Sequence, residues 1–136
     1  MTTIRDTFRR SRGAPWRLRL SACALALVTT ACADKTDAPR VLAGADPSRA
    51  VTIMERAGCG ACHAVPGLEW PAGSLGPSLD GFGGSPLIAG RLPNQPAVLT
   101  SFLRDAPSLL PDTAMPAMPL TQDEARDVAA YLYTLR

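Results

Sequence analysis

The C-terminal part of the sequence shows the clearest alternation of apolar and polar positions. Its apolar residues recur every three or four positions, the spacing of one face of an α-helix: Ala125, Val128, Ala129, Leu132 and Leu135. Thr121 and Glu124 precede this stripe at the three-residue spacing of a capping box, and Asp123 adds negative charge where the helix dipole favours it. The pattern predicts a helix that begins after Thr121.

Two further stretches have helical spacing. The first is predicted to begin at Asp46, an N-cap residue followed by Pro47, and to end at Gly58. The second is predicted over residues 95–104, with Asn94 as its cap. The inward-facing positions are Ala50, Ile53, Met54 and Ala57 in the first helix and Val98, Leu99, Phe102 and Leu103 in the second.

Between these helices the sequence predicts loops. Residues 64–93 are rich in glycine and proline, which favours turns. Pro107 ends the second helix, and Pro111, Pro116 and Pro119 exclude a helix or a central strand and predict a stiff extended loop over residues 109–120. No strand pattern competes, so we expect a small all-α fold.

Residues 1–31 have the composition of an export signal. Six arginines against one aspartate precede residue 20, and residues 20–31 form an apolar run that ends in small residues and is short for a membrane span. Cleavage before Cys32 would leave a lipidated N-terminus, whereas cleavage after Ala33 would release a soluble product. Either outcome predicts a periplasmic protein, soluble or membrane-anchored, with residues 32–45 as a linker and residues 46–136 as one domain.

Removal of the signal changes the net charge. The whole chain carries a formal charge of +2, but six of its 14 basic and one of its 12 acidic residues lie at or before residue 33. The remainder therefore has a formal charge of −3. Nucleic-acid binding requires a basic face, so we expect no nucleic-acid partner.

The one histidine of the chain directly follows two cysteines, in Cys59-Gly60-Ala61-Cys62-His63. A structural zinc ion needs four N or S ligands, and beyond residue 33 there is no further Cys or His. A thioredoxin-like dithiol would need a βαβ context, which is lacking. A plain disulfide is the simplest structural alternative.

Covalent haem attachment accounts best for the spacing. Two thiols three positions apart on a tight turn can add to both vinyl groups of one porphyrin, and the next side chain then meets the iron. The pattern predicts one haem c, attached through Cys59 and Cys62, with His63 as an iron ligand. Met115 and Met118, in the proline-rich loop, are candidates for the sixth ligand because a thioether is soft and favours ferrous iron. Met54 is expected in the core.

Over residues 50–136 the chain resembles the single-haem class I cytochromes c with His/Met ligation. It is similar to the cytochrome domain fused to subunit II of some bacterial haem–copper oxidases and its free-standing relatives. The resemblance rests on CGACH (59–63), GPSLDGFGG (76–84), IAGRLPN (88–94), DTAMP (112–116) and LTQDEARDVAAYLYTL (120–135). It implies the small cytochrome c fold, with three to four helices around one haem.

The resemblance also implies roles for single residues. Met115 would be the axial ligand and Met118 a packing residue. The Pro77 carbonyl would accept a hydrogen bond from His63 Nδ1–H, and Leu79 would pack on the haem. Arg91 and Asn94 match positions near the haem and could hold a propionate. The alternative for Arg91 is a solvated side chain, and the alternative for Asn94 is a helix cap. Tyr131 and Trp70 are expected in the core.

These features predict an electron carrier rather than an enzyme. Its partners would be a quinol-oxidising complex or dehydrogenase and a terminal oxidase, and it would be a separate carrier or a subunit of a respiratory complex. Beyond residue 33 the only lysine is Lys35, so docking should rely on an apolar patch rather than on lysines. A haem-based sensor or peroxidase-like protein is the alternative if no methionine ligates, and a copper(I)-handling protein is the alternative if no haem binds.

Overall fold

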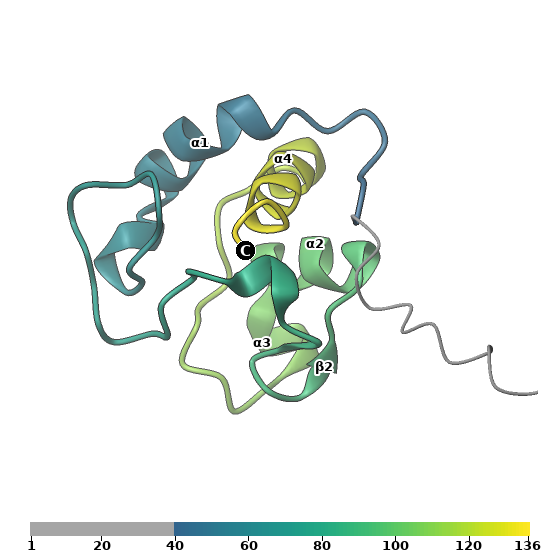
Figure 1. Cartoon of the computed structure of the whole chain (residues 1–136). Coiled ribbons are helices and arrows are strands. Elements are labelled where there is room, and N and C mark those ends of the chain that lie inside the picture. Colours follow the sequence, from purple (N-terminus) through teal and green to yellow (C-terminus); the bar gives the residue numbers. More distant parts are fainter. Residues whose placement is uncertain (1–39) are drawn as a thin grey trace, which may run out of the picture. The chain divides into compact units, whose positions relative to one another are not determined.

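Helices dominate the part of the chain that the computed structural model describes, residues 40–136 (Figure 1). The predicted signal and the Cys32 lipid site lie outside these residues. In chain order the elements are η3 (Pro47–Arg49), α1 (Ala50–Ala57), η4 (Cys59–Ala61), η5 (Phe82–Gly84), β1 (Leu87–Ile88), β2 (Leu92–Pro93), α2 (Pro96–Arg104), α3 (Ala106–Leu109) and α4 (Gln122–Leu132). The expected all-α fold is confirmed, and no helix of residues 40–136 is long and apolar enough to cross a bilayer.

The first predicted helix is present with the expected ends. Asp46 caps it by accepting a hydrogen bond from the Ser48 N–H, although the first turn is the 3₁₀ turn η3 rather than α-helix. At its end Gly58 takes φ 77°, a left-handed conformation that glycine adopts without a Cβ clash. Met54 is 1% exposed, which confirms its place in the core.

The second predicted helix starts one residue later than expected, and its predicted cap is wrong. Gln95 is the N-cap residue of α2 and makes no side-chain cap bond. The Asn94 side chain is buried and turned to other groups: Nδ2 donates to the Ser85 carbonyl at 2.9 Å, and Oδ1 accepts from the Tyr133 hydroxyl at 3.0 Å. After α2 the chain bends at Asp105 and resumes as α3, so the proline at position 107 begins a short helix instead of leading into a loop.

A two-stranded antiparallel hairpin, β1–β2, was not expected from the sequence. Leu87 pairs with Pro93 and Ile88 with Leu92. The turn between them has positive φ at Ala89 (49°) and Gly90 (68°), the backbone of a tight hairpin turn. Each strand is only two residues long and one contains a proline, so no period-two pattern marks them.

The C-terminal helix α4 forms the centre of the packing, against α1, η3 and α2. Its capping box is complete: Thr121 Oγ1 accepts from the Glu124 N–H, and the Glu124 carboxylate accepts from the Thr121 N–H. The apolar stripe is buried at Ala125, Val128, Ala129 and Leu132. Tyr131 is half-buried and donates to the Pro66 carbonyl at 2.6 Å.

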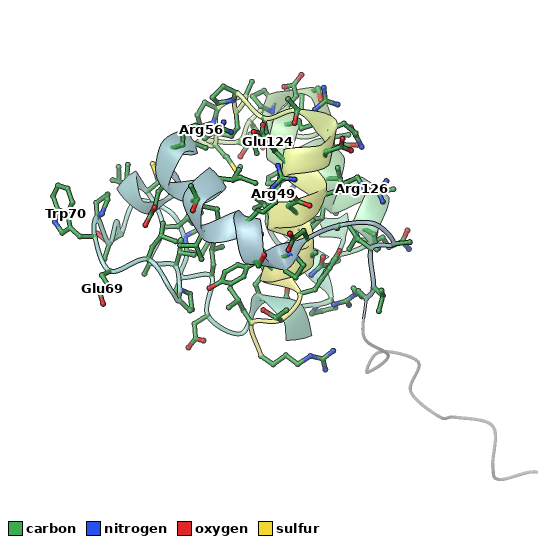
Figure 2. All side chains as sticks on the ribbon, turned by 90° about the horizontal axis from the view of Figure 1, so that it is seen from above. Arg49, Arg56, Glu69, Trp70, Glu124 and Arg126 are labelled. Atoms are coloured by element: carbon green, nitrogen blue, oxygen red, sulfur yellow. The ribbon has the colours of Figure 1, made fainter. Side chains whose placement is uncertain are left out.

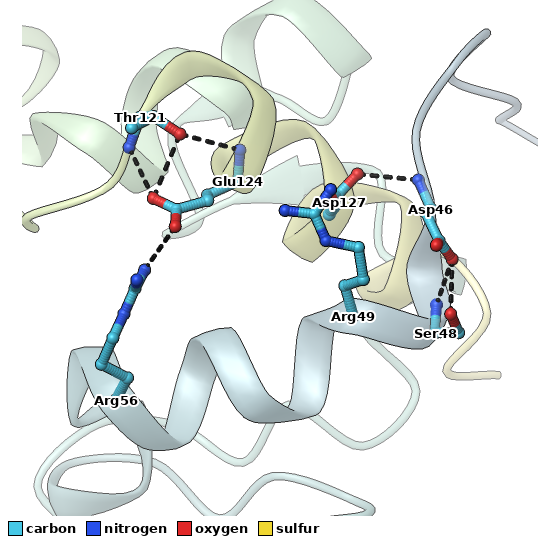
Figure 3. A network of polar contacts seen from close by, with 7 residues as sticks. All are labelled: Asp46, Ser48, Arg49, Arg56, Thr121, Glu124 and Asp127. Atoms are coloured by element: carbon cyan, nitrogen blue, oxygen red, sulfur yellow. Dashed lines mark hydrogen bonds and ion pairs between the residues drawn. The ribbon is translucent and has the colours of Figure 1, made fainter.

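Polar contacts fasten the N-terminal entry of the domain to α4 (Figure 3). The buried carboxylate of Asp127 accepts from the Asp46 N–H at 2.7 Å. Its other oxygen lies 3.4 Å from Arg49 Nη1, close enough for an ion pair, while it has no hydrogen bond in the structure. A second pair, Arg56 with Glu124, joins α1 to the first turn of α4. These contacts fix how α1 crosses α4, and α1 leads directly into the turn that carries the cysteines.

Candidate haem-binding site

Cys59 and Cys62 lie on a tight turn at the end of α1. The turn η4 is held by hydrogen bonds from the Ala61 N–H to the Gly58 carbonyl and from the His63 N–H to the Cys59 carbonyl, both at 3.0 Å. Both cysteines are half-buried free thiols, and Cys59 packs against the core. Burial raises the pKa of the Cys59 thiol, the reverse of the shift found in activated redox cysteines.

The following loop is tied to this turn at two points. The Gly73 N–H donates to the Gly60 carbonyl and the Gly76 N–H to the Cys62 carbonyl, each at 2.8 Å. A Cβ at position 60 would stand 2.4 Å from the Pro71 carbonyl oxygen, so only glycine allows the loop to approach this closely. Glycine at position 60 is therefore required by the protein's own packing.

The imidazole of His63 is oriented by Gly76 and Pro77. Its Nδ1 lies 2.7 Å from the Pro77 carbonyl oxygen, which is the hydrogen bond that the family resemblance implies. A carbonyl only accepts, so Nδ1 carries the proton and Nε2 keeps its lone pair for a metal. A Cβ at position 76 would be 2.4 Å from the ring atom Cε1. Leu79 is half-buried against the core, and its N–H donates to the Ala64 carbonyl at 2.9 Å.

The two candidate methionines are both half-buried and both touch the core. Their backbones are held differently. The Met118 N–H donates to the Arg104 carbonyl at 2.9 Å, beside a bridge between Asp105 and Ala117, so this residue is fastened to the end of α2. The Met115 N–H instead donates to Thr113 Oγ1 within its own loop.

Arg91 and Asn94, the two weaker candidates, already have protein partners. Both carboxylate oxygens of Asp112 lie 2.7 Å from Arg91 Nη1, and this contact holds the pKa of Asp112 below its usual value. The pair connects the β1–β2 hairpin to the loop that carries Met115. Asn94 is buried by the contacts described above. A role of either residue at a propionate stays a prediction.

The donor set fits a covalently attached haem better than the alternatives. Within residues 40–136, no group of three or more His, Cys, Asp or Glu side chains is placed to hold a metal ion by itself. Two thiols on one turn and an imidazole with a free Nε2 are the groups that haem c uses. Trp70, expected in the core, is instead 85% exposed, whereas Leu68, two positions earlier, is buried.

The comparisons with known proteins identify the family of the chain. The family model described as cytochrome c matches residues 48–136, which is more than half of the chain. The chain therefore belongs to the cytochrome c family, whose members bind haem c and transfer electrons through it. It is also 35% identical over 85 residues to cytochrome c oxidase subunit 2 of Alkalihalophilus pseudofirmus. That match covers 62% of this chain but only 24% of the relative, so the chain spans about a quarter of that protein's length.

Proposed function

We propose that this protein is a periplasmic or membrane-tethered carrier of single electrons, with one haem c attached through Cys59 and Cys62 and ligated by His63 and Met115. Haem c supplies the Fe(II)/Fe(III) couple when it is bound. The single observation that carries the proposal is the hydrogen bond of 2.7 Å between His63 Nδ1 and the Pro77 carbonyl. This hydrogen bond orients the His63 imidazole, which directly follows the two free thiols in a chain of the cytochrome c family.

The chain's own residues would do three things for such a carrier. The two cysteines hold the porphyrin at one edge, on a turn fastened to α1 and to the 73–76 loop. The Pro77 carbonyl keeps the His63 ring in one orientation and strengthens it as a donor. The core packed behind Cys59, Leu79 and Met115 limits access of water, so that little rearranges when the charge on iron changes.

A terminal oxidase, or a respiratory complex of which the chain is a subunit, is the proposed acceptor. The similarity to an oxidase subunit 2 over 85 residues supports this. A quinol-oxidising complex or a dehydrogenase would supply the electron. If His63 and Met115 both held the iron, no position on it would remain open for a substrate, which favours a carrier over an enzyme.

The test is intact-mass analysis of the protein purified from periplasm and membranes of cells that attach haem c. We expect one haem-sized addition that survives denaturation and acid–acetone extraction, and complete loss of that addition in the double variant Cys59→Ala, Cys62→Ala. The control is Cys23→Ala, in the predicted signal, which should change nothing in the mature protein. The same spectra report the mature N-terminus and any lipid on Cys32. Colour that acid–acetone extracts from wild-type protein would refute the proposal.

A further inference from the structure

The largest exposed aromatic side chain in the described residues lies on the loop next to the cysteine turn. Trp70 is 85% exposed, although its large apolar ring would normally be buried. It projects from one side of the molecule together with Glu69, apart from Arg49, Arg56 and Arg126 (Figure 2). We call Glu69, Trp70 and Pro71 the Trp70 surface.

The backbone around the Trp70 surface is held firmly. The Pro66 carbonyl accepts from the Tyr131 hydroxyl of α4 at 2.6 Å, and Leu68 is buried in the core. On the other side the Gly73 N–H is bound to the Gly60 carbonyl between the two cysteines. An exposed indole on a fixed loop loses little conformational freedom when it is covered, which is the property of an interface anchor.

The surface also lies against the electron-transfer site. The Pro71 carbonyl oxygen lies against Gly60: a Cβ added at position 60 would be only 2.4 Å from it. This loop is therefore in direct contact with the turn that carries both thiols. A partner that covers Trp70 is therefore brought to the edge at which the porphyrin is attached. Leu75 is equally exposed, but it adjoins Gly76 against the His63 ring, and we assign it to the haem site rather than to this surface.

The charges of this part of the chain indicate the chemistry of the partner. Between Arg56 and Arg91 the only charged residues are Glu69 and Asp80, both acidic. A complementary protein surface would carry arginines or lysines around an apolar depression that accepts an indole ring. A membrane rich in anionic lipid would be repelled by the same charges.

We propose that the Trp70 surface is the docking site for a protein redox partner with a basic rim around an apolar pocket. This inference rests on the proposed function. Trp70 would be the central contact and would set affinity, and Glu69 would make a rim contact that sets the salt dependence. The indole would not touch the reacting iron, so it would act on binding and not on the electron-transfer step.

The experiment uses haem-loaded protein and membranes of the organism that encodes it. Oxidation of the reduced carrier and reduction of the oxidised carrier are each followed against carrier concentration and salt. In at least one direction we expect Trp70→Ala to raise KM roughly ten- to thirty-fold with kcat unchanged. Trp70→Phe keeps an aromatic ring, so its KM should stay much closer to that of the wild type. Glu69→Gln should raise KM about two- to five-fold and reduce its salt dependence. For the wild type, KM should rise with salt.

The matched control is Val41→Ala, which removes an apolar side chain that is 79% exposed and lies outside this loop. It should leave KM unchanged. A KM of Trp70→Ala equal to wild type in both directions overturns the proposal, as does a wild-type KM that falls with salt. A changed visible spectrum or reduction potential in Trp70→Ala would place the indole in the haem pocket and would also overturn it. So would Trp70-dependent self-association, or binding to phosphatidylglycerol vesicles, with unchanged KM.

These results separate the two proposals. Wild-type protein that carries no covalent haem, or that membranes neither oxidise nor reduce, refutes the proposed function before any variant is compared. Normal turnover of wild type with an unaffected Trp70→Ala variant refutes only the docking site.

Discussion

Two methionines only three positions apart differ in what holds them. The backbone of Met118 is bound to the Arg104 carbonyl at the end of α2, whereas Met115 lies in the part of the loop joined to the hairpin through Asp112 and Arg91. Because the backbone of Met118 is fixed to the end of α2, its side chain is suited to a packing role. Met115 is held only within its own loop, so it is the better candidate for a ligand of the haem iron.

We therefore predict that Met115→Ala abolishes Fe–Met ligation and Met118→Ala retains it. Loss of the thioether should lower the reduction potential on the order of 0.1 V, within the roughly 0.8 V that axial ligands span. The measurement is the weak far-red band of the oxidised protein together with a redox titration. Loss of that band in Met118→Ala alone would assign the ligand to Met118. Its absence from wild type would favour the sensor or peroxidase alternative.

The approach of Gly76 to the imidazole gives a second prediction at the scale of one residue. A methyl group at position 76 would overlap the His63 ring, so Gly76→Ala should lower the free energy of unfolding by about 1–3 kcal/mol and weaken the contact with Pro77. Gly84→Ala is the control, since a Cβ there has no neighbour within 4 Å. Denaturant unfolding of both variants measures the difference. Equal stability of the two would contradict the close contact.

At the scale of elements, the capping box of α4 is coupled to α1. The Thr121 N–H donates to the Glu124 carboxylate and Arg56 pairs with it, and these contacts lower the pKa of Glu124 from 4.5 to about 2. A carboxyl group whose pKa is lowered on folding stabilises the fold above its unfolded pKa. Its contribution is lost as the pH falls from 4.5 towards 2.

Thermal unfolding against pH tests this. Wild type should be more stable than Glu124→Gln at neutral pH, and the difference should shrink as the pH falls through that range. Arg56→Gln keeps the capping box, whose backbone contact is the largest cause of the shift, so it should retain most of the pH dependence. A wild-type advantage that persists undiminished at acid pH would argue against the assignment.

At the scale of the whole domain, one buried carboxylate joins its two ends. Asp127 of α4 accepts from the backbone of Asp46, 81 positions earlier in the chain, and lies near Arg49. This contact sets where η3 and α1 meet α4, and so where the cysteine turn stands relative to the core.

Removal of that carboxylate should destabilise the domain. Asp127→Ala leaves the Asp46 N–H without its partner, and we expect a loss of about 1–3 kcal/mol in the free energy of unfolding. Asp123→Ala, on the exposed face of the same helix, should cost less than about 1 kcal/mol. Denaturant unfolding of the haem-loaded proteins compares the two. A smaller loss at position 127 than at position 123 would contradict this role.

Contacts between neighbours in the chain were predictable from the sequence. The capping box at Thr121, the helix end at Gly58 and the Cys59–His63 turn all depend on residues within three or four positions of one another, and the structure contains each of them. The candidate thiols and imidazole followed from the same short spacing.

Tertiary structure decided the contacts between distant residues. Asn94 has a good capping side chain, but it bonds Tyr133, 39 positions away. Leu68 is buried in the core, whereas Trp70, two positions later, is exposed. The closeness of Gly76 to the His63 ring depends likewise on how a long loop folds back. The spacing of residues along the sequence determines which side chains are available for local contacts. The packing of the chain determines which distant groups they meet. A polar side chain that is buried must then form a hydrogen bond with one of those groups, because an unpaired buried polar group is costly.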